Sequence, residues 1–248
     1  MFTALYQAFL DVLAPRICLI CGALLTDERV PHCLGKYVCT RCFDRLPPAD
    51  VSGALLAGIS SHFRGDELAV SSITARFQRE FDSGTSQESI HEDSTPISLL
   101  LYALKYHGMQ GLGRSLGQEL GYCLQLLNQT SYDAIVPVPI HSARERERGY
   151  NQSLRIAEGI ADIVNIPVEK DAVVRHTYTL SQTYLNAEER KNNVKNVFSA
   201  GRRGNALKGA SILLVDDILT TGSTLNACAM TMLQYGARRV DAATVAKA

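Results

Sequence analysis

Two adjacent carboxylates and the hydroxyl side chains that follow them are the groups best suited to chemistry in this sequence. Asp216 and Asp217 come directly after the apolar run SILLV, residues 211–215. A continuous apolar run predicts a parallel strand that is buried on both faces of a sheet. We therefore expect the two acids at the carboxyl end of that strand, where open α/β sheets bind their ligands.

The segment after the acids predicts a phosphate site. It turns into a helix predicted over residues 223–235, and the free N–H groups and positive dipole end of a helix N-terminus favour an anion. Gly222 would let the backbone approach that anion closely. This hydroxyl loop consists of Thr220, Thr221, Gly222, Ser223 and Thr224.

The acids and the hydroxyl loop together indicate one class of ligand. Carboxylates accept hydrogen bonds from vicinal hydroxyls or join a Mg²⁺ shell, but they repel a phosphate. The expected ligand therefore carries a diol beside a phosphate, as ribose 5-phosphate does. Phospho-acceptor and glycosyl-transfer sites also place acids at a strand end, without needing the hydroxyl loop. An ordinary N-capped helix would explain one hydroxyl and not four, and no P-loop motif is present.

Two Cys-x-x-Cys pairs, separated by 17 residues, lie near the N-terminus. Two such pairs predict a closed tetrahedral site for a structural Zn²⁺. The alternative is a cluster of buried, reduced cysteines. Cys33 lies outside both pairs, and His32 beside it is an alternative ligand. The four expected ligands are Cys18, Cys21, Cys39 and Cys42.

The basic residues of this N-terminal unit allow two interpretations. A zinc unit often contacts nucleic acid or protein, but surface charges also keep a small lobe soluble, and the second interpretation is favoured. The residues in question are Arg16, Arg29, Lys36, Arg41 and Arg45.

The overall composition excludes a strong electrostatic field. Lys plus Arg and Asp plus Glu number 25 each, so any basic surface must be local. No apolar run reaches the roughly 20 residues that span a bilayer, and the N-terminus lacks a charged region and cleavage site typical of secretion. We expect a soluble, cytoplasmic protein without an integral membrane segment. Leu5, Phe9, Val12 and Leu13 predict an amphipathic helix packed on its own protein, with a membrane-surface or partner helix as the alternative.

The periodicity of apolar residues predicts strands that alternate with helices, which implies parallel β-α-β units. Glycines at 111, 113 and 117 resemble a dinucleotide loop, but their spacing and the helix before them exclude it. Strands are also expected within 62–81. Helices are expected from residue 97, over 113–128, over 151–164 and over 223–235, the last ending at Gly236; strands are expected over 133–140, 171–176, 210–217 and 238–248.

The expected organisation has three parts. Residues 1–50 hold the N-terminal helix and the zinc unit and end at the paired prolines of RLPPAD. Residues 51–131 contain connecting strands, helices and a polar, acidic stretch at 82–96 that predicts a mobile loop. Residues 132–248 form the ligand-binding α/β domain.

The segment LLVDDILTTGST, residues 213–224, resembles the ribose-phosphate signature of type I phosphoribosyltransferases. That resemblance implies phosphoribosyl pyrophosphate as ligand, with Asp216 and Asp217 on the ribose hydroxyls and the hydroxyl loop on the 5-phosphate. It also implies an α/β fold in which helices flank a parallel sheet.

Further motifs narrow the resemblance to the ComF/GntX family of competence-associated proteins. They are LKYHG (104–108), IVPVPI (135–140), RERGYNQSLRIA (146–157) and SQTYLNAEERKNNV (181–194), and all four follow the two cysteine pairs in the sequence. The family implies a type I phosphoribosyltransferase fold with an N-terminal zinc finger and a role in DNA uptake or utilisation. GYNQ stands where the family usually has GFNQ, and the acidic loop at 82–96 is longer than expected.

These motifs also supply candidate ligand contacts. Arg144, Arg146 and Arg148 follow a predicted strand and could contact a pyrophosphate, with Arg148 as the preferred contact. Alternatively, RERER is a solvated turn in which charges of alternating sign compensate one another. Lys105 could reach the same anion or be an ordinary helix-end lysine. Residues 181–194 are expected to close over the ligand as a lid. The candidate lid contacts are Gln182, Arg190 and Asn193.

Two functions remain open from the sequence. The chain is either a protein that binds phosphoribosyl pyrophosphate and engages single-stranded DNA or uptake-machinery partners, or an active transferase in which Mg²⁺ assists the departure of pyrophosphate. No acceptor site is evident, and Phe2 replaces the cysteine that an amidotransferase would need. Neutral charge and the lack of interleaved aromatic residues weaken the DNA interpretation.

Overall fold

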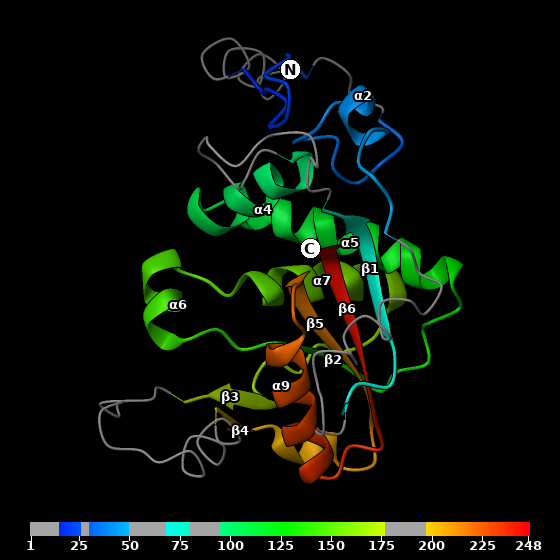
Figure 1. Ribbon diagram of the computed structural model, residues 1–248, viewed down its shortest axis with the longest axis vertical. Coiled ribbons are helices and arrows are strands. Elements are labelled where there is room, and N and C mark those ends of the chain that lie inside the picture. Colours follow the sequence, from blue (N-terminus) through cyan, green and yellow to red (C-terminus); the bar gives the residue numbers. More distant parts are fainter. Residues whose placement is uncertain (1–14, 26–29, 50–67, 80–94, 177–196) are drawn as a thin grey trace, which may run out of the picture.

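The computed structural model describes residues 15–25, 30–49, 68–79, 95–176 and 197–248. Figure 1 shows its central sheet with the N-terminal cysteine unit at one end of the molecule. Helices occupy Thr40–Phe43 (α2), Pro96–Tyr106 (α4), Gln110–Leu126 (α5), Ser142–Arg148 (α6), Gln152–Val164 (α7) and Ser223–Gln234 (α9), with a 3₁₀ turn at Gly204–Leu207. Strands occupy Ile73–Gln78 (β1), Ala134–Pro137 (β2), Val173–Arg175 (β3), Phe198–Ala200 (β4), Ser211–Leu219 (β5) and Arg239–Lys247 (β6).

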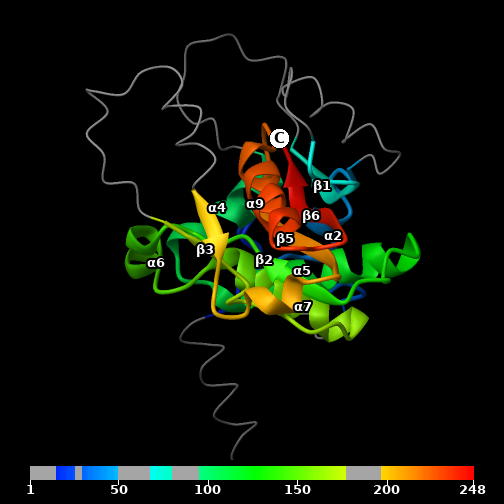
Figure 2. The ribbon, with the colours of Figure 1, turned by 90° about the horizontal axis from the view of Figure 1, so that it is seen from below.

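Four parallel strands form the main sheet in the order β1–β6–β5–β2. Strands β5 and β6 are central and largely buried on both faces, as the apolar run at 211–215 predicts for β5. Figure 2 shows α9 on one side of this sheet and α5 and α7 on the other. The predicted α/β fold with a parallel sheet flanked by helices is therefore confirmed.

The segment 171–176 differs from its expected role. Its strand β3 pairs antiparallel with β4 in a separate two-stranded sheet. The parallel contact to the edge of the main sheet is made earlier in the chain, where Val168 bridges Ile135. Three β-branched and apolar residues indicate a strand but not its partner, which here lies beyond the segment 177–196.

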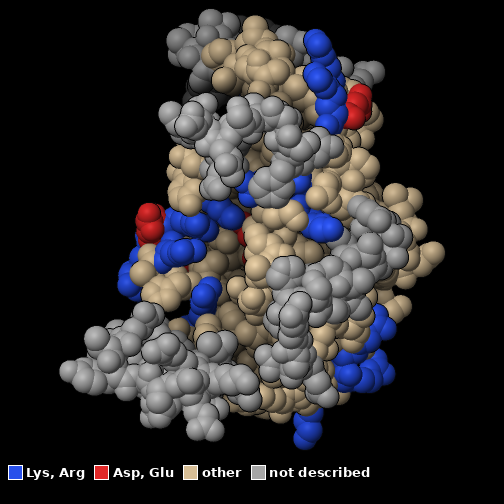
Figure 3. All heavy atoms as spheres, in the orientation of Figure 1, with Lys and Arg blue, Asp and Glu red and all other residues tan. Residues whose placement is uncertain are grey.

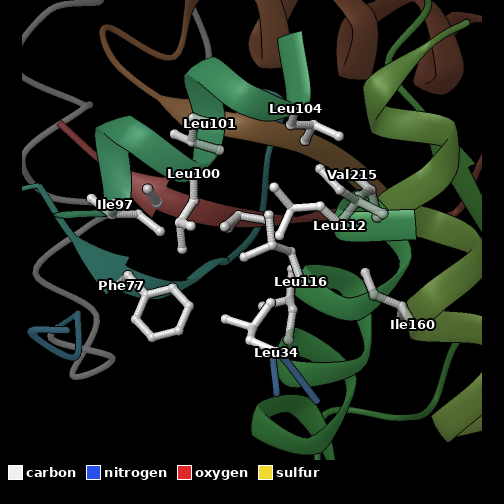
Figure 4. Packing of buried hydrophobic residues seen from close by; sticks show 14 of the residues in the cluster. Leu34, Phe77, Ile97, Leu100, Leu101, Leu104, Leu112, Leu116, Ile160 and Val215 are labelled. Atoms are coloured by element: carbon white, nitrogen blue, oxygen red, sulfur yellow. The ribbon is translucent and has the colours of Figure 1, made fainter. Parts of the chain in front are cut away.

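Two hydrophobic cores lie on opposite faces of the main sheet. One joins α4, α5 and α7 to the sheet, and Figure 4 shows Leu100, Leu104 and Leu116 meeting Phe77 and Val215 there. It also takes in buried residues of the cysteine unit. The other lies between α9 and the sheet and extends to β3 and β4.

Helices α5 and α7 pack unusually closely because glycines face each other. A Cβ at Gly117 would lie 2.0 Å from the carbonyl oxygen of Ile156, and one at Gly159 would lie 2.0 Å from that of Arg114. The glycines of 111–121 thus serve helix packing, which agrees with rejecting a dinucleotide loop. Helix α5 begins at Gln110, three residues earlier than expected.

The three-part organisation stays a prediction, although described residues of all three parts contribute to the same one of the two cores. Strand β1 pairs with β6, and α5 packs on α7, so parts of 51–131 are continuous with 132–248. The expected helix at Leu5–Leu13 and most of the acidic stretch at 82–96 lie outside the described residues. No helix within the described ranges has both the length and the apolarity to cross a membrane.

Candidate functional site

The two acids lie at a step in the main sheet. Strand β2 pairs with β5 only as far as Pro137 opposite Val215, where the amide of Val138 donates to the Val215 carbonyl at 2.9 Å. On its other side β5 continues along β6 to Leu219. Asp216 and Asp217, expected as the last residues of the strand, therefore lie inside β5, because the ladder with β6 keeps the chain extended to Leu219. Toward β2, however, they emerge where the neighbouring strand has ended.

A pocket of about 150 Å³ lies at this step. Its walls come from α4, from the segment between β2 and α7, from β3 and from the start of α9. Figure 3 shows basic side chains gathered around a hollow in this face, with an acidic group visible inside it. The charged and hydroxyl side chains that line the pocket are Lys105, Arg144, Arg148, Arg175, Asp216, Asp217 and Thr224.

Asp217 is paired with a cation from another helix. Its side chain is largely buried, and its Oδ2 lies 2.6 Å from Nζ of Lys105 on α4. Because a carboxylate in this position would otherwise be desolvated and unpaired, Lys105 compensates much of its charge. Lys105 is thus an ion-pair partner inside the pocket rather than an ordinary helix-end lysine.

Asp216 is held by hydrogen bonds to one of its two oxygens. Ser153 Oγ donates to Oδ1 at 2.8 Å, and the amide of Asp217 donates to the same atom at 2.9 Å. Burial and the neighbouring charge of Asp217 raise the pKa of Asp216 to about 7, despite these bonds and Lys105. Near neutral pH this carboxyl therefore changes charge readily, as groups at functional sites often do.

The start of the motif GYNQS ties α7 to two walls of the pocket. The hydroxyl of Tyr150 donates to the carbonyl of Leu104, beside Lys105. Asn151 caps α7 through its side-chain oxygen, and its Nδ2 donates to the carbonyl of Val138 at 3.0 Å. These bonds fix α4 and the segment after β2 against the N-terminus of α7.

The end of the same motif positions charged groups inside the pocket. Nη1 of Arg148 donates to Oε1 of Gln152 at 2.9 Å, while Ser153 holds Asp216. The four consecutive side chains of Tyr150, Asn151, Gln152 and Ser153 therefore connect the start of α7 to different walls of the pocket. Arg148, at the head of this motif, was predicted as a contact from the sequence. Ser153 was not, because a serine in a helix gives no signal of a distant partner.

The hydroxyl loop forms the tight turn between β5 and α9. Gly222 has φ of 76° at the N-cap of α9, a left-handed conformation that glycine adopts without strain. Thr221 and Ser223 hydroxyls lie 2.7 Å apart and are exposed. Thr224 lines the pocket, and the other loop residues adjoin it along the chain.

The structure brings together some of the predicted contacts and adds others. Lys105, Arg144, Arg148 and both acids line one pocket, whereas Arg146 is not among its lining residues. Gln182, Arg190 and Asn193, with the proposed lid at 181–194, lie outside the described residues. Residues that were not predicted as contacts also line the pocket, among them His141, Gln152 and Arg175.

The four paired cysteines converge near the other end of the molecule. The candidate ligand atoms of Cys18, Cys21, Cys39 and Cys42 all lie within 4.8 Å of one another, an arrangement that a metal ion could occupy. The tight turns of both pairs produce it, since Gly22 N donates to Cys18 O and Cys42 N donates to Cys39 O.

The donor set of this cluster fits a divalent metal. Burial opposes ionisation of Cys18, but backbone hydrogen bonds lower its thiol pKa to about 7. Burial and neighbouring thiols raise the pKa of Cys42. Four thiolates this close would repel one another unless a cation lay between them, as Zn²⁺ does in Cys₄ sites.

His32 and Cys33 lie outside this cluster. The ring of His32 stacks on Phe43 with centroids 4.0 Å apart, and the amide of Cys33 donates to Glu119 at 2.7 Å. Both residues line a cavity of about 600 Å³ between the cysteine unit and α5. Neither side chain is among the ligand groups that the structure gathers.

Comparison with known proteins supports these features. A model of the phosphoribosyl transferase domain matches residues 150–248. Competence protein F of Haemophilus influenzae is 31% identical over 157 residues, covering 62% of this chain and 69% of that protein. DNA utilization protein YhgH of Salmonella typhi is 33% identical over 157 residues, covering 62% and 68%. Competence protein ComFC of Bacillus subtilis is 27% identical over 153 residues, covering 60% and 58%.

The match to competence protein F covers more than two thirds of that relative. The match to the phosphoribosyl transferase domain begins at residue 150, in the GYNQS motif that connects the pocket walls. The cysteine cluster at the N-terminus agrees with the zinc unit expected of such proteins. The chain therefore belongs to the competence protein F family, and its C-terminal part is a phosphoribosyltransferase-like domain.

Proposed function

We propose that this protein binds phosphoribosyl pyrophosphate in the pocket at the step between β2 and β5. The observation that carries this proposal is the separation of charge within the pocket. Two carboxylates lie on β5, whereas Arg144, Arg148 and Arg175 come from the segment before α7 and from β3. A ligand with hydroxyls at one end and a pyrophosphate at the other matches that separation.

The hydrogen bonds of the acids favour the same ligand. Among the described residues, Ser153 and the amide of Asp217 donate to Oδ1 of Asp216, and Lys105 pairs with Oδ2 of Asp217. One oxygen of each carboxylate is thus left for a hydroxyl donor from the sugar. Backbone N–H groups and hydroxyls of the loop before α9 are suited to the 5-phosphate.

Two metals fit the residues that are present. Mg²⁺ would be held chiefly by the phosphate oxygens of the ligand itself and would neutralise its pyrophosphate, because the arginines on that wall offer no oxygen ligand. Zn²⁺ would be held by the four paired cysteines. Since four thiolates close its coordination sphere, this zinc would stabilise the N-terminal unit and take no part in a reaction.

The relatives are named for competence and DNA utilization, and we extend that role to this chain as part of the proposal. Its partners would then include single-stranded DNA and proteins of DNA uptake. The alternative is an active transferase that releases pyrophosphate on transfer of the ribosyl group to an acceptor. The carboxylates beside the expected ribose would tolerate the positive charge that develops in such a reaction.

Calorimetric titration with phosphoribosyl pyrophosphate and Mg²⁺ tests the proposed site. Replacing a charged hydrogen-bond partner typically costs about 1.5–3 kcal/mol. The variant Asp216→Asn/Asp217→Asn should therefore bind at least about tenfold more weakly than the native protein. The surface variant Asp162→Asn, whose carboxylate pairs with Arg114, is the matched control and should bind normally. Equal affinity of the double variant and the native protein would refute the site.

A turnover assay separates the two functions. The native protein, phosphoribosyl pyrophosphate and Mg²⁺ are incubated with a panel of bases, amines and oligonucleotides, and released pyrophosphate is measured. Release that requires one acceptor, and that disappears in the double Asn variant, would establish a transferase. Binding by calorimetry without release from any acceptor would favour the binding protein.

A further inference from the structure

Helix α4 exposes two tyrosine rings on its outer face. Tyr102 is 45% exposed and Tyr106 is 59% exposed, and their ring centroids lie 4.8 Å apart. The ring of His107 meets Tyr102 edge to face at 5.4 Å. The opposite face of the helix fills the core with Leu100 and Leu104, so the tyrosines are not needed for burial.

Cationic groups adjoin these rings. Cζ of Arg148 lies 5.4 Å from the ring centroid of Tyr106, a distance typical of a cation–π contact. Lys105 lies between the two tyrosines in the sequence, and it lines both the phosphoribosyl pocket and a second hollow of about 150 Å³ beneath Tyr102 and Tyr106. The aromatic face is therefore continuous with the anion-binding pocket.

The charge around the aromatic face favours an anion. Helix α6 presents Arg144, Arg146 and Arg148, and Figure 3 shows basic side chains concentrated on this side of the molecule. Glu145 and Glu147 on the same helix offset part of this charge. The sequence conceals the arrangement because the arginine that contacts Tyr106 comes from a different helix.

We propose that this aromatic face, made of Tyr102, Tyr106 and His107 with Arg148, binds single-stranded DNA. Unpaired bases would stack on the exposed tyrosine rings, and the backbone phosphates would lie near the arginines of α6. Ring faces combined with neighbouring cations are the features that single-strand-binding proteins use. A duplex fits less well, since its bases already stack within the helix.

The open shape of the surface favours a DNA strand over a free base as the ligand. Tyr102 and Tyr106 are about half exposed on the outer surface of α4, so their rings could cover only one side of a small molecule. A strand gains affinity from several stacked bases and phosphates at once. This inference extends the DNA-handling part of the proposed function, and it places the DNA on α4 instead of the cysteine unit.

Fluorescence anisotropy with a labelled oligothymidylate, measured in a series of salt concentrations, tests the proposal. The variant Tyr102→Ala/Tyr106→Ala should lose about tenfold or more in affinity, because stacking losses of this size accompany alanine substitution. Tyr102→Phe/Tyr106→Phe should bind almost normally, since phenylalanine keeps the ring. Tyr235→Ala is the matched control, as this tyrosine is 50% exposed at the end of α9.

Calorimetry with phosphoribosyl pyrophosphate on the same variants keeps the two proposals distinguishable. Normal ligand binding by the Ala double variant, together with weak DNA binding, would support the aromatic face and show that the chain is folded. DNA binding equal to that of the native protein, or native protein that binds no oligothymidylate at low salt, would overturn it and leave the ligand pocket untouched. Equally tight binding of a duplex, or displacement of the strand by free thymidine, would also overturn it.

Discussion

The cysteine cluster and the pocket around Asp216 and Asp217 are built in different ways. The cluster takes its four side chains from residues 18–42, and the tight turn within each Cys-x-x-Cys pair brings two sulfurs together. The pocket takes its groups from α4, from the segment after β2, from β3, from β5 and from α9. Spacing along the chain therefore predicts the first site completely, whereas the second depends on how the sheet and helices pack.

This difference predicts different sensitivities to mutation. Loss of one ligand should abolish metal binding by the cluster, because three thiolates no longer close a tetrahedral coordination sphere. The pocket should instead respond in steps, since three of its walls are each tied to the start of α7 by a separate hydrogen bond.

The largest effect is expected from Cys39→Ser. Structural Zn²⁺ contributes about 10–16 kcal/mol to folding in isolated zinc-binding peptides at neutral pH. The variant should lose its zinc and become sensitive to proteases within residues 15–49. Metal analysis of the purified protein and limited proteolysis measure this. Cys33→Ser is the matched control and should keep one zinc per chain; full zinc content in Cys39→Ser would show that the cluster is not the metal site.

A smaller effect is expected from Gly117→Ala, which tests the packing that carries the pocket. The new Cβ would clash with the Ile156 backbone, and overpacking of this kind costs about 1–3 kcal/mol. Denaturant unfolding should show that loss, and phosphoribosyl pyrophosphate should bind more weakly, because α7 holds three pocket walls. The zinc content should not change.

Gly111→Ala on the same helix is the control for this substitution. Its Cβ would meet the hydroxyl end of the Tyr37 side chain, which can move aside. We therefore expect little loss of stability in this variant. Equal stability of both variants would show that the close packing of α5 and α7 is not essential.

The pKa of Asp216 predicts a pH dependence of about tenfold in ligand affinity. Because its pKa is about 7 in the folded protein, the carboxyl is mostly protonated at pH 6 and mostly ionised at pH 8. Affinity for the sugar hydroxyls should rise over this range. Without ligand the opposite holds between about pH 4 and 7: the folded state binds more protons than the unfolded state, so stability falls as pH rises.

Calorimetry and thermal unfolding at several pH values measure both trends. The ligand's own phosphate groups also titrate, so Asp216→Asn serves as the control. Its affinity should vary less with pH than that of the native protein. The same slope in both proteins would contradict the assignment of the titration to Asp216.

The smallest effect is expected from Ser153→Ala. The Ser153 hydroxyl lowers the pKa of Asp216, so its removal should move the midpoint of the pH dependence to higher pH. Affinity well above that midpoint should be nearly unchanged. Ser115→Ala, on α5, provides the comparison. An unchanged midpoint in Ser153→Ala would mean that this bond does not tune the acid.

Much of the fold followed from local patterns. The apolar run before Asp216 predicted a central strand, and the turn at Gly222 predicted the helix after it. The pairing of β3 with β4 was not predictable, because three residues indicate an extended segment without naming its neighbour. The continuation of β5 beyond Asp217 to Leu219 was missed for a related reason: strand length depends on how far β6 continues beside it.

The sequence by itself determined which groups are present and which local turns they make: two cysteine knuckles, two adjacent acids and a hydroxyl loop before a helix. Tertiary structure decided which distant residues join them. It brought Lys105 to Asp217, Ser153 to Asp216 and Arg148 to Tyr106. Local geometry depends on backbone preferences that neighbouring residues fix, whereas these contacts arise only when α4, α6 and α7 pack around the end of β2.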